Sequence, residues 1–127
     1  MKQLIVRIIP AVAWMAFIFF MSSQEQFPST LGVSIMLLTV VGHMVLYGVL
    51  GLLLLFAFAG TARPSRTTMA AAVLGAALYG VTDEFHQSFV PGRDASVFDL
   101  FVNTVGATLA VISSTFARST LTSASSR

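Results

Sequence analysis

Four long apolar stretches, separated by three short polar breaks, set the pattern of this chain. The stretches run over Leu4–Met21, Leu37–Ala59, Thr68–Gln87 and Val97–Ala117. Each is close to the roughly 20 residues that an α-helix needs to cross the hydrocarbon core of a bilayer. The breaks carry Pro28, Pro64 and Pro91-Gly92, which favour turns over continued helix. The pattern predicts an all-α fold, namely a four-helix transmembrane bundle that forms one domain.

The composition is that of a chain covered by lipid rather than by water. Hydrophobic residues make up 56% of the 127 positions and charged residues only 9%, whereas about 25% of residues are charged in soluble domains. The net charge of +2 comes from cations scattered near the ends of the apolar stretches. Because they form no basic patch, nucleic acid is not an expected partner. Cysteine is absent, which excludes disulfides and thiolate metal ligands.

The two ends of the chain need separate interpretation. Lys2 and Arg7 precede an apolar stretch as in a signal peptide, but Ser22-Ser23-Gln24-Glu25 offers no small-residue cleavage site. The first stretch is therefore expected to remain as a helix. After residue 117 the sequence is rich in Ser and Thr. Residues 1–117 are expected to form the membrane domain, and residues 118–127 a disordered cytoplasmic tail.

The charged residues predict an orientation in the membrane. With a cytoplasmic N-terminus, six of the seven cations lie on the inner side: Lys2, Arg7, Arg63, Arg66, Arg118 and Arg127. The outer side then holds Arg93 and every acidic residue: Glu25, Asp83, Glu84, Asp94 and Asp99. Because cytoplasmic loops are enriched in Lys and Arg, both termini are expected to be cytoplasmic.

Small residues recur at four-residue steps in the last two apolar stretches. They are Ala72, Ala76 and Gly80 in the third stretch, and Gly106 and Ala110 in the fourth. This spacing places small side chains on one helical face, where backbones can approach closely. We expect the third and fourth helices to pack tightly. The pattern is common in alanine-rich segments, so it carries no functional assignment.

Polar residues inside three of the apolar stretches point to a site. They occur as pairs four residues apart, so each pair shares a helical face: His43 and Tyr47, Asp83 and Gln87, Asp99 and Asn103. At the helical rise, His43, Asp83 and Asn103 lie about 20–24 Å from the expected inner boundaries. Three helices of alternating direction then bring their polar faces to one level in the outer leaflet. Polar groups at such a depth need a structural or functional reason.

Structural explanations compete with a site at several of these positions. Glu84 and His86, which lie nearest to the surface, are explained equally well by contacts with lipid head groups. His43, Asp83 and Asn103 lie too deep for that explanation, so they either fasten the helices together or form a functional site; we favour the site. Tyr47 lies deeper still and could serve packing alone.

The segment between the third and fourth stretches has its own chemistry. Pro91-Gly92 predicts a turn, and Arg93 follows as the one outer cation. Its guanidinium could pair with Asp83 or Asp99 and hold the loop over the bundle, or it could bind an anionic head group or phosphate. Ser96, with Asp99 three residues later, matches a capping box at the start of a helix.

These residues define a candidate polar site, called the polar site below. It comprises His43, Tyr47, Asp83, Glu84, His86, Gln87, Arg93, Asp99 and Asn103. None of them is assigned a catalytic role.

The motif around the polar site resembles the signature of the VanZ-like family of membrane proteins. The resemblance rests on the run from Asp83 to Arg93, followed by Ser96, Asp99, Asn103 and Gly106. Upstream, it extends to His43, Tyr47 and Leu50 in the second helix and to Ser22-Ser23 after the first. It therefore covers nearly the whole chain up to the tail.

This resemblance implies a bacterial cytoplasmic (inner) membrane protein with a role in the cell envelope. The family takes its name from an accessory protein of glycopeptide-antibiotic resistance linked to teicoplanin tolerance, but membership by itself implies neither resistance nor a mechanism. Many members carry a lysine shortly before the second-helix histidine, whereas Thr39, Val40 and Val41 precede Gly42-His43 here. If that lysine binds an anionic ligand in other members, this chain must bind one differently or not at all.

Three functions are compatible with the sequence. The first is an accessory or binding protein that recognises an anionic envelope lipid or a glycopeptide-like ligand, with Arg93 as the anion contact. The second is a membrane enzyme for a lipid-linked or phosphate-bearing substrate, whose Asp, Glu and His side chains act as acid and base or hold a divalent metal. A proton carrier using His43, Asp83 and Asp99 ranks last, because the inner half of the bundle offers little for a path. No cofactor motif is evident, and an oligomer is compatible with each function.

Overall fold

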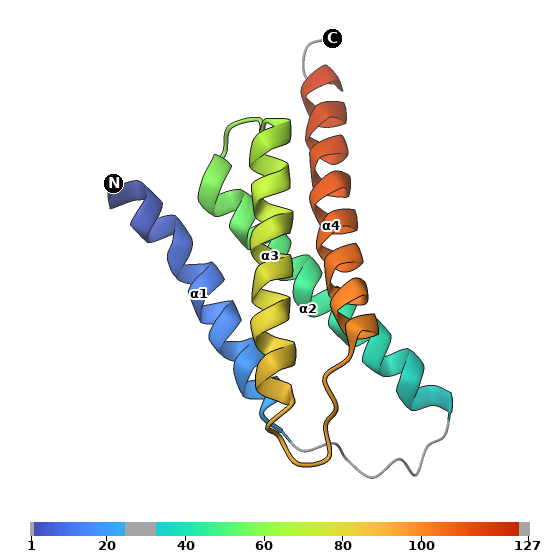
Figure 1. The fold of residues 1–127 in the computed structure, drawn as a ribbon. Helices are drawn as coiled ribbons and strands as arrows, with labels where there is room; N and C mark the ends of the chain where they lie inside the picture. Colours follow the sequence, from blue (N-terminus) through green and yellow to red (C-terminus); the bar gives the residue numbers. More distant parts are fainter. Residues whose placement is uncertain (1, 25–32, 125–127) are drawn as a thin grey trace.

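The chain folds into four α-helices, as the pattern of apolar stretches predicts (Figure 1). The structure is a computed structural model that describes residues 2–24 and 33–124. The helices are α1 (Lys2–Ser22), α2 (Val33–Ala59), α3 (Arg66–Gln87) and α4 (Val97–Ala124). No strand occurs within the two described ranges, so the all-α prediction is confirmed.

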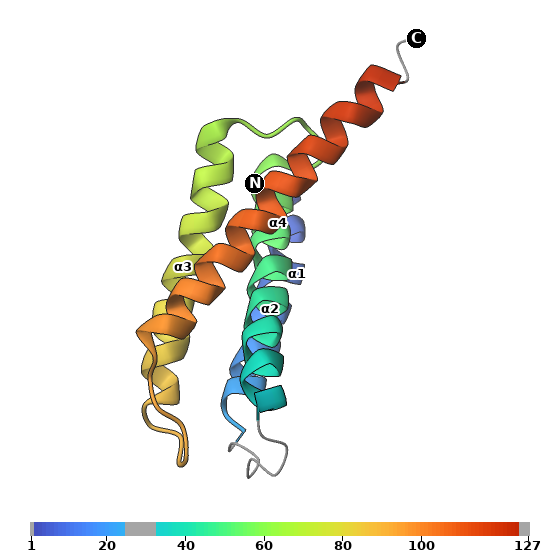
Figure 2. The same ribbon diagram turned by 90° about the vertical axis from the view of Figure 1, so that its right-hand side faces the viewer.

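The four helices form a bundle in which successive helices run in opposite directions (Figure 1). The starts of α1 and α3 therefore lie at one end of the bundle with the ends of α2 and α4, and the α3–α4 loop lies at the other end. α4 packs against both α2 and α3, and toward its C-terminal end it leans away from the other helices (Figure 2). α1 packs against α2 and α3 at the edge of the bundle.

Three of the helices are long and apolar enough to cross a membrane, judged by length and composition. The segments are Gln3–Ser22, Leu37–Ala59 and Val97–Ala117. Within the described part of the chain, α3 does not meet this measure, so the predicted fourth span at Thr68–Gln87 is not supported by it. The face of α3 that the other helices cover has small residues in its first half and polar residues in its second, and both lower the mean hydropathy of the helix. These residues are Ala72, Ala76, Gly80, Asp83, Glu84 and Gln87.

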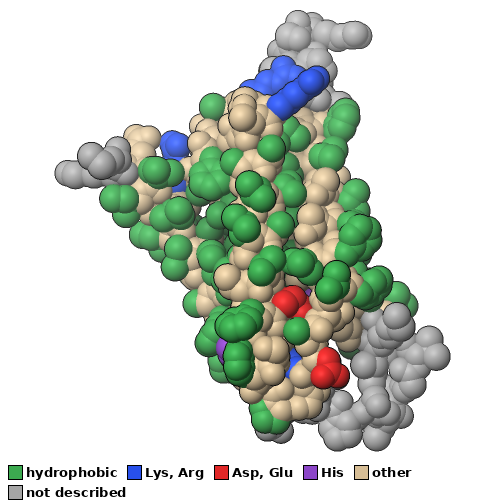
Figure 3. Space-filling model, viewed as in Figure 1, with side chains coloured by type: hydrophobic (Ala, Val, Ile, Leu, Met, Phe, Trp, Pro, Cys, Tyr) green, Lys and Arg blue, Asp and Glu red, His purple; other side chains and the backbone are tan. Residues whose placement is uncertain are grey.

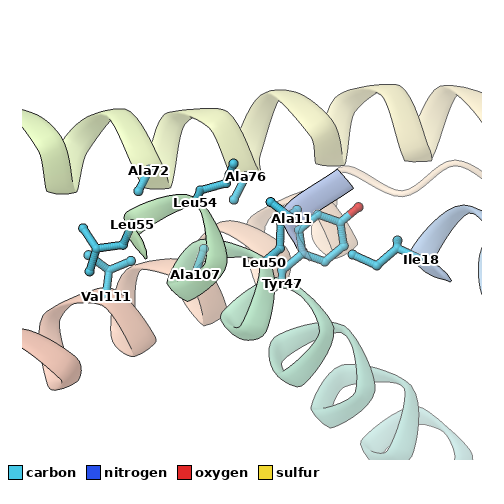
Figure 4. Close-up of a cluster of buried hydrophobic side chains, with 10 residues drawn as sticks. All are labelled: Ala11, Ile18, Tyr47, Leu50, Leu54, Leu55, Ala72, Ala76, Ala107 and Val111. Atoms are coloured by element: carbon cyan, nitrogen blue, oxygen red, sulfur yellow. The ribbon is translucent and has the colours of Figure 1, made fainter. Parts of the chain in front are cut away.

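The core of the bundle is built from aliphatic side chains, alanines and one tyrosine (Figure 4). Its members are Ala11, Ile18, Tyr47, Leu50, Leu54, Leu55, Ala72, Ala76, Ala107 and Val111. Tyr47 lies toward the polar end of this cluster, with Ile18 of α1 beyond its ring (Figure 4). Large apolar side chains also cover the outer faces of the helices (Figure 3). An apolar outer surface of this extent suits contact with lipid rather than water.

α2 and α4 approach each other closely at Gly106. A Cβ atom at this position would lie 2.5 Å from the carbonyl oxygen of Met44 and 2.7 Å from its Cα. One turn along α2, a Cβ at Gly48 would lie 3.5 Å from the Cβ of Ala110. The small residues of α4 thus face α2, because α4 crosses α2 at this point. α3 and α4 do pack together, but through larger side chains as well, such as Leu100 against Gly80.

The C-terminal end of α4 corrects one prediction. The helix continues past Ala117 to Ala124, so most of the segment 118–127, which is predicted to be a disordered tail, is helical. Residues 125–127 lie outside the described residues. The continuation is reasonable because no Pro or Gly follows Ala117 to end the helix.

Charged residues separate by sign between the two ends of the bundle. Lys2, Arg7, Arg63 and Arg66 lie at the end where α1 and α3 begin. The opposite end of the bundle, which holds the α3–α4 loop, contains Asp83, Glu84, Asp94 and Asp99 together with Arg93. On the face shown in Figure 3, the acidic side chains accordingly lie toward the lower end and most of the basic ones toward the upper end. Glu25 and Arg127, which belong to the predicted pattern, lie outside the described residues.

Candidate functional site

Asp83 is the centre of the polar contacts between α2 and α3. Its Oδ2 accepts a hydrogen bond from the hydroxyl of Tyr47 at 3.1 Å and another from Nε2 of Gln87 at 3.0 Å. All three side chains are buried. Gln87 lies one turn after Asp83 on the same face of α3, and Tyr47 reaches across from α2. The sequence left open whether Tyr47 serves packing alone. In the structure it belongs both to the core and to the polar site.

Gln87 connects this carboxylate to Arg93. While its Nε2 donates to Asp83, its Oε1 accepts a hydrogen bond from Nη1 of Arg93 at 3.3 Å. The other two guanidinium nitrogens donate to main-chain carbonyls at the C-terminal end of α1: Nε to Gln24, just after the helix, at 3.1 Å and Nη2 to Met21, in its last turn, at 3.5 Å. Among the described contacts, Arg93 thus pairs directly with neither of the two carboxylates suggested by the sequence. It fastens the α3–α4 loop to the end of α1 instead.

His43 and Asn103 join α2 to α4. Nδ1 of His43 lies 2.9 Å from Oδ1 of Asn103. Because an amide oxygen only accepts hydrogen bonds, the imidazole is the donor here and carries its proton on Nδ1. Asn103 is fully buried, and His43 is partly buried. Two residues that the sequence places at one level on different helices are therefore in direct contact.

Gly80 brings the Tyr47–Asp83 contact and Asn103 to the same level of the bundle. A Cβ at Gly80 would lie 3.4 Å from Cε1 of Tyr47 and 3.6 Å from Nδ2 of Asn103. Gly80 is three residues before Asp83, on the same buried face of α3. The sequence pattern assigns Gly80 only to packing. Its spacing from Asp83 is the signal that ties it to the polar site.

Glu84 caps the N-terminus of α4 from α3. Its Oε2 accepts a hydrogen bond from the main-chain N–H of Ser96 at 2.9 Å. Oγ of Ser96 in turn accepts from the main-chain N–H of Asp99 at 3.2 Å. The bond between Ser96 Oγ and the N–H of Asp99 is the one that the predicted capping box expects. In a complete box the side chain of Asp99 would accept from the N–H of Ser96, but here Glu84 of α3 accepts that bond. Glu84 is therefore buried between helices, and contact with lipid head groups does not describe it.

His86 and Asp99 lie at the margins of these contacts. The ring of His86 stacks on Phe19 of α1, with centroids 4.1 Å apart and an interplanar angle of 28°. His86 thus belongs to the contact between α1 and α3. Asp99 is partly buried and interacts electrostatically with Glu84.

Four buried polar atoms of the polar site have no hydrogen-bond partner within the described residues, and one of them is Nδ1 of the partly buried His86. The other three are Oδ1 of Asp83, Oε1 of Glu84 and Nδ2 of Asn103, on residues that are 3%, 7% and 0% exposed. A buried polar group without a partner costs about 1–3 kcal/mol. Groups of this kind in a folded protein indicate an interaction that contacts within the chain do not provide.

Within residues 2–24 and 33–124, no group of three or more His, Asp and Glu side chains is placed so that it could hold an ion. The recorded contacts describe a hydrogen-bonding site, in which Asp83 of α3 and Asn103 of α4 each bond to a side chain of α2.

The helices and the polar site together define a class of protein. An all-α chain with three helices of membrane-spanning length and apolarity is a helical membrane protein, and its buried polar groups lie at one end of the bundle. The chain belongs to the VanZ/LLP1 family, whose sequence model matches residues 7–118. This match confirms the resemblance to the VanZ-like family. Comparison with curated proteins and with solved structures gave no match.

Proposed function

We propose that this protein is an accessory or binding protein of the bacterial cell envelope, held in the cytoplasmic (inner) membrane by four spanning helices. α3 is included as a span because its 22 residues reach across a bilayer core. Its carboxylates face other helices rather than lipid. The cation-rich end is placed in the cytoplasm by the positive-inside rule, with both termini inside and the polar site in the outer leaflet.

The unpartnered buried atoms of the polar site support a binding function. Residues that only fasten helices together are expected to satisfy one another, because each unpaired group weakens the bundle. Asp83, Glu84 and Asn103 each keep one atom without a partner within the described residues. Ionisable residues at membrane depth commonly mark ligand or ion sites. An envelope lipid or a glycopeptide-like ligand is the proposed occupant.

The proposed topology is tested by single-cysteine labelling, since the chain has no cysteine to remove. Ala95→Cys marks the α3–α4 loop and Thr61→Cys marks the turn between α2 and α3, and both positions are exposed. A membrane-impermeant maleimide applied to spheroplasts should label the first variant, and the second only after permeabilisation. Equal labelling of both variants from one side would show that α3 does not cross the membrane.

The binding function is tested by purifying the protein and identifying retained lipid by native mass spectrometry. The wild-type chain should retain envelope lipid, and Asn103→Leu should lose it while circular dichroism shows unchanged helicity. Phe116→Leu, on an exposed outer position of α4, is the matched control and should behave like the wild type. Release of all lipid from the wild type under gentle conditions would contradict binding.

A role in glycopeptide tolerance is the finer part of the proposal. Expression of the chain in a bacterial host should raise the inhibitory concentration of teicoplanin, and Asp83→Leu should remove the effect at equal membrane levels. No change with the wild type would remove antibiotic tolerance from the proposal while leaving lipid binding intact. A mass-shifted product formed from the bound lipid would instead favour the alternative of a membrane enzyme.

A further inference from the structure

The polar site has more hydrogen-bond acceptors and more negative charge than the chain itself satisfies. Asp83 and Glu84 each have one carboxylate oxygen with no partner within the described residues. Glu84 also interacts electrostatically with Asp83 and Asp99. Asp83, Glu84 and Asp99 therefore lie at the end of the bundle where Arg93 is the one Lys or Arg among the described residues, and His43 also interacts with Glu84.

Arg93 is already engaged by the protein. Its Nε, Nη1 and Nη2 atoms each donate to a protein oxygen, and two of these oxygens belong to the main chain at the C-terminal end of α1. A phosphate that entered the site would face carboxylates that repel it, and three of the five N–H donors of Arg93 are already bonded to protein oxygens. The electrostatics of the interior thus favour a positive group, whereas the sequence pattern favours an anion.

We infer that the polar site binds the primary ammonium group of an amine-bearing envelope lipid, an inference that rests on the proposed binding function. A primary ammonium carries three N–H donors and one positive charge. It can donate to Oδ1 of Asp83 and to Oε1 of Glu84 in charge-assisted hydrogen bonds, which are the stronger kind. Both unpartnered oxygens would then be satisfied by one group.

Nδ2 of Asn103 adds a second requirement to the ligand. This atom is a donor, fully buried and without a partner, so it needs an acceptor close to the ammonium. A hydroxyl or phosphate-ester oxygen two carbons from the amine fits that requirement. The combination describes a 2-aminoethyl phosphate head group.

The number of N–H donors on the ligand separates this inference from simple charge attraction. A trimethylammonium group has the same charge but no N–H, so it cannot donate to either carboxylate oxygen. A glycerol head group has hydroxyl donors but no positive charge. The site should therefore prefer ethanolamine over choline and over glycerol head groups.

The test uses the full chain in nanodiscs of phosphatidylglycerol that contain equal minor fractions of phosphatidylethanolamine and phosphatidylcholine. Lipids that stay bound after ejection are counted by native mass spectrometry. Phosphatidylethanolamine should be enriched about tenfold over phosphatidylcholine, which corresponds to one well-formed interaction. Mono- and dimethylated phosphatidylethanolamine should show stepwise lower retention. Equal retention of the ethanolamine and choline lipids by the wild type would overturn the inference without any variant.

Charge-neutral, isosteric variants show which carboxylates cause the preference for ethanolamine over choline lipids. Asp83→Asn and Glu84→Gln, alone and together, should reduce the ethanolamine preference toward one, with helicity and membrane level checked in parallel. Asp94→Asn is the matched control, since it removes the same charge from an exposed position of the α3–α4 loop. A preference that survives in the double variant, or that disappears in the Asp94 variant, would contradict the assignment.

Two further results show whether the amine belongs to a lipid or to a soluble molecule, and whether a failure concerns this inference or the proposed binding function. Free ethanolamine added to the nanodiscs should not displace the lipid; displacement at equal concentration would show a soluble amine ligand and overturn the lipid assignment. If the wild type retained no lipid of any kind, the proposed binding function would fail. If it retained phosphatidylglycerol and phosphatidylcholine as well as phosphatidylethanolamine, only the ammonium inference would fail.

Discussion

The hydroxyl of Tyr47 donates a hydrogen bond to Oδ2 of Asp83 over 3.1 Å, and this contact joins the hydrophobic core to the polar site. The tyrosine ring packs with Leu50 of its own helix and with Ile18 of α1. Its hydroxyl holds Oδ2 of Asp83 in place, and Nε2 of Gln87 donates to this same carboxylate oxygen from within α3. Oδ1 is therefore held in a defined direction although it has no partner of its own.

Removing this hydroxyl should weaken the bundle measurably. Tyr47→Phe keeps the ring in the core and deletes one hydrogen bond to Asp83. Hydrogen bonds between membrane helices are worth about 0.6–1.7 kcal/mol, so the free energy of unfolding should fall by an amount in that range. Unfolding by sodium dodecyl sulfate in mixed micelles measures the change.

A double-mutant cycle gives this prediction its control. If the bond is direct, the effects of Tyr47→Phe and Asp83→Ala should not add, and the coupling energy should be about 1 kcal/mol. The same cycle between Asp83→Ala and Tyr79→Phe should show less coupling, because the hydroxyl of Tyr79 donates to the carbonyl of Met15 instead. Additive effects for the first pair would show that Tyr47 contributes only packing.

Gly106 should be one of the least replaceable residues of the bundle. In Gly106→Ala the new Cβ meets main-chain atoms of Met44 at 2.5 Å and 2.7 Å, so α2 and α4 must separate. Overpacking of this kind costs about 1–3 kcal/mol. Gly42→Ala is the matched control, since a Cβ at Gly42 has nothing within 4 Å, and better helix propensity should leave stability equal or slightly raised. Equal stability losses in the two variants, measured in mixed micelles, would contradict this close approach.

Much of the fold follows from the sequence because hydrophobic length and turn residues act locally. Four apolar stretches bounded by proline and glycine predict four helices, and the structure confirms all four. The three polar pairs predict which faces meet, because residues four apart share a helical face. Contacts of Tyr47 with Asp83 and of His43 with Asn103 agree with that prediction.

The parts that the sequence did not predict depend on how the helices cross. Small residues at four-residue spacing do not say which helix they face, and Gly106 packs on α2 because α4 crosses it there. Similarly, the charge of Arg93 suggests a carboxylate partner, yet its position relative to α1 places main-chain carbonyls within reach first. The acceptor for Ser96 comes from Glu84, twelve residues earlier, for the same reason.

Arg93 should hold the end of α1 against the rest of the bundle. Arg93→Gln removes the donors to the carbonyls of Met21 and Gln24. Amide hydrogen exchange at the end of α1 and in the α3–α4 loop should therefore become several-fold faster. Arg63→Gln removes the same charge at the opposite end of the bundle and should leave exchange at these sites unchanged. Unchanged exchange in the Arg93 variant would mean that α1 is held by its packing against α2 and α3 alone.

The contact between His43 and Asn103 makes a spectroscopic prediction. With Oδ1 of Asn103 as acceptor at 2.9 Å, the neutral imidazole must carry its proton on Nδ1, whereas the Nε2–H tautomer predominates for a free histidine side chain. Nitrogen-15 chemical shifts of histidine in the reconstituted protein distinguish the two tautomers, and His86→Gln leaves His43 as the only labelled ring. The Nδ1–H form should dominate at neutral pH, and Asn103→Leu should shift the population toward Nε2–H because the acceptor is lost. Dominance of the Nε2–H form with Asn103 in place would mean that the amide presents its nitrogen to the ring, which would turn Oδ1 toward α3 and remove the unpartnered donor from the polar site.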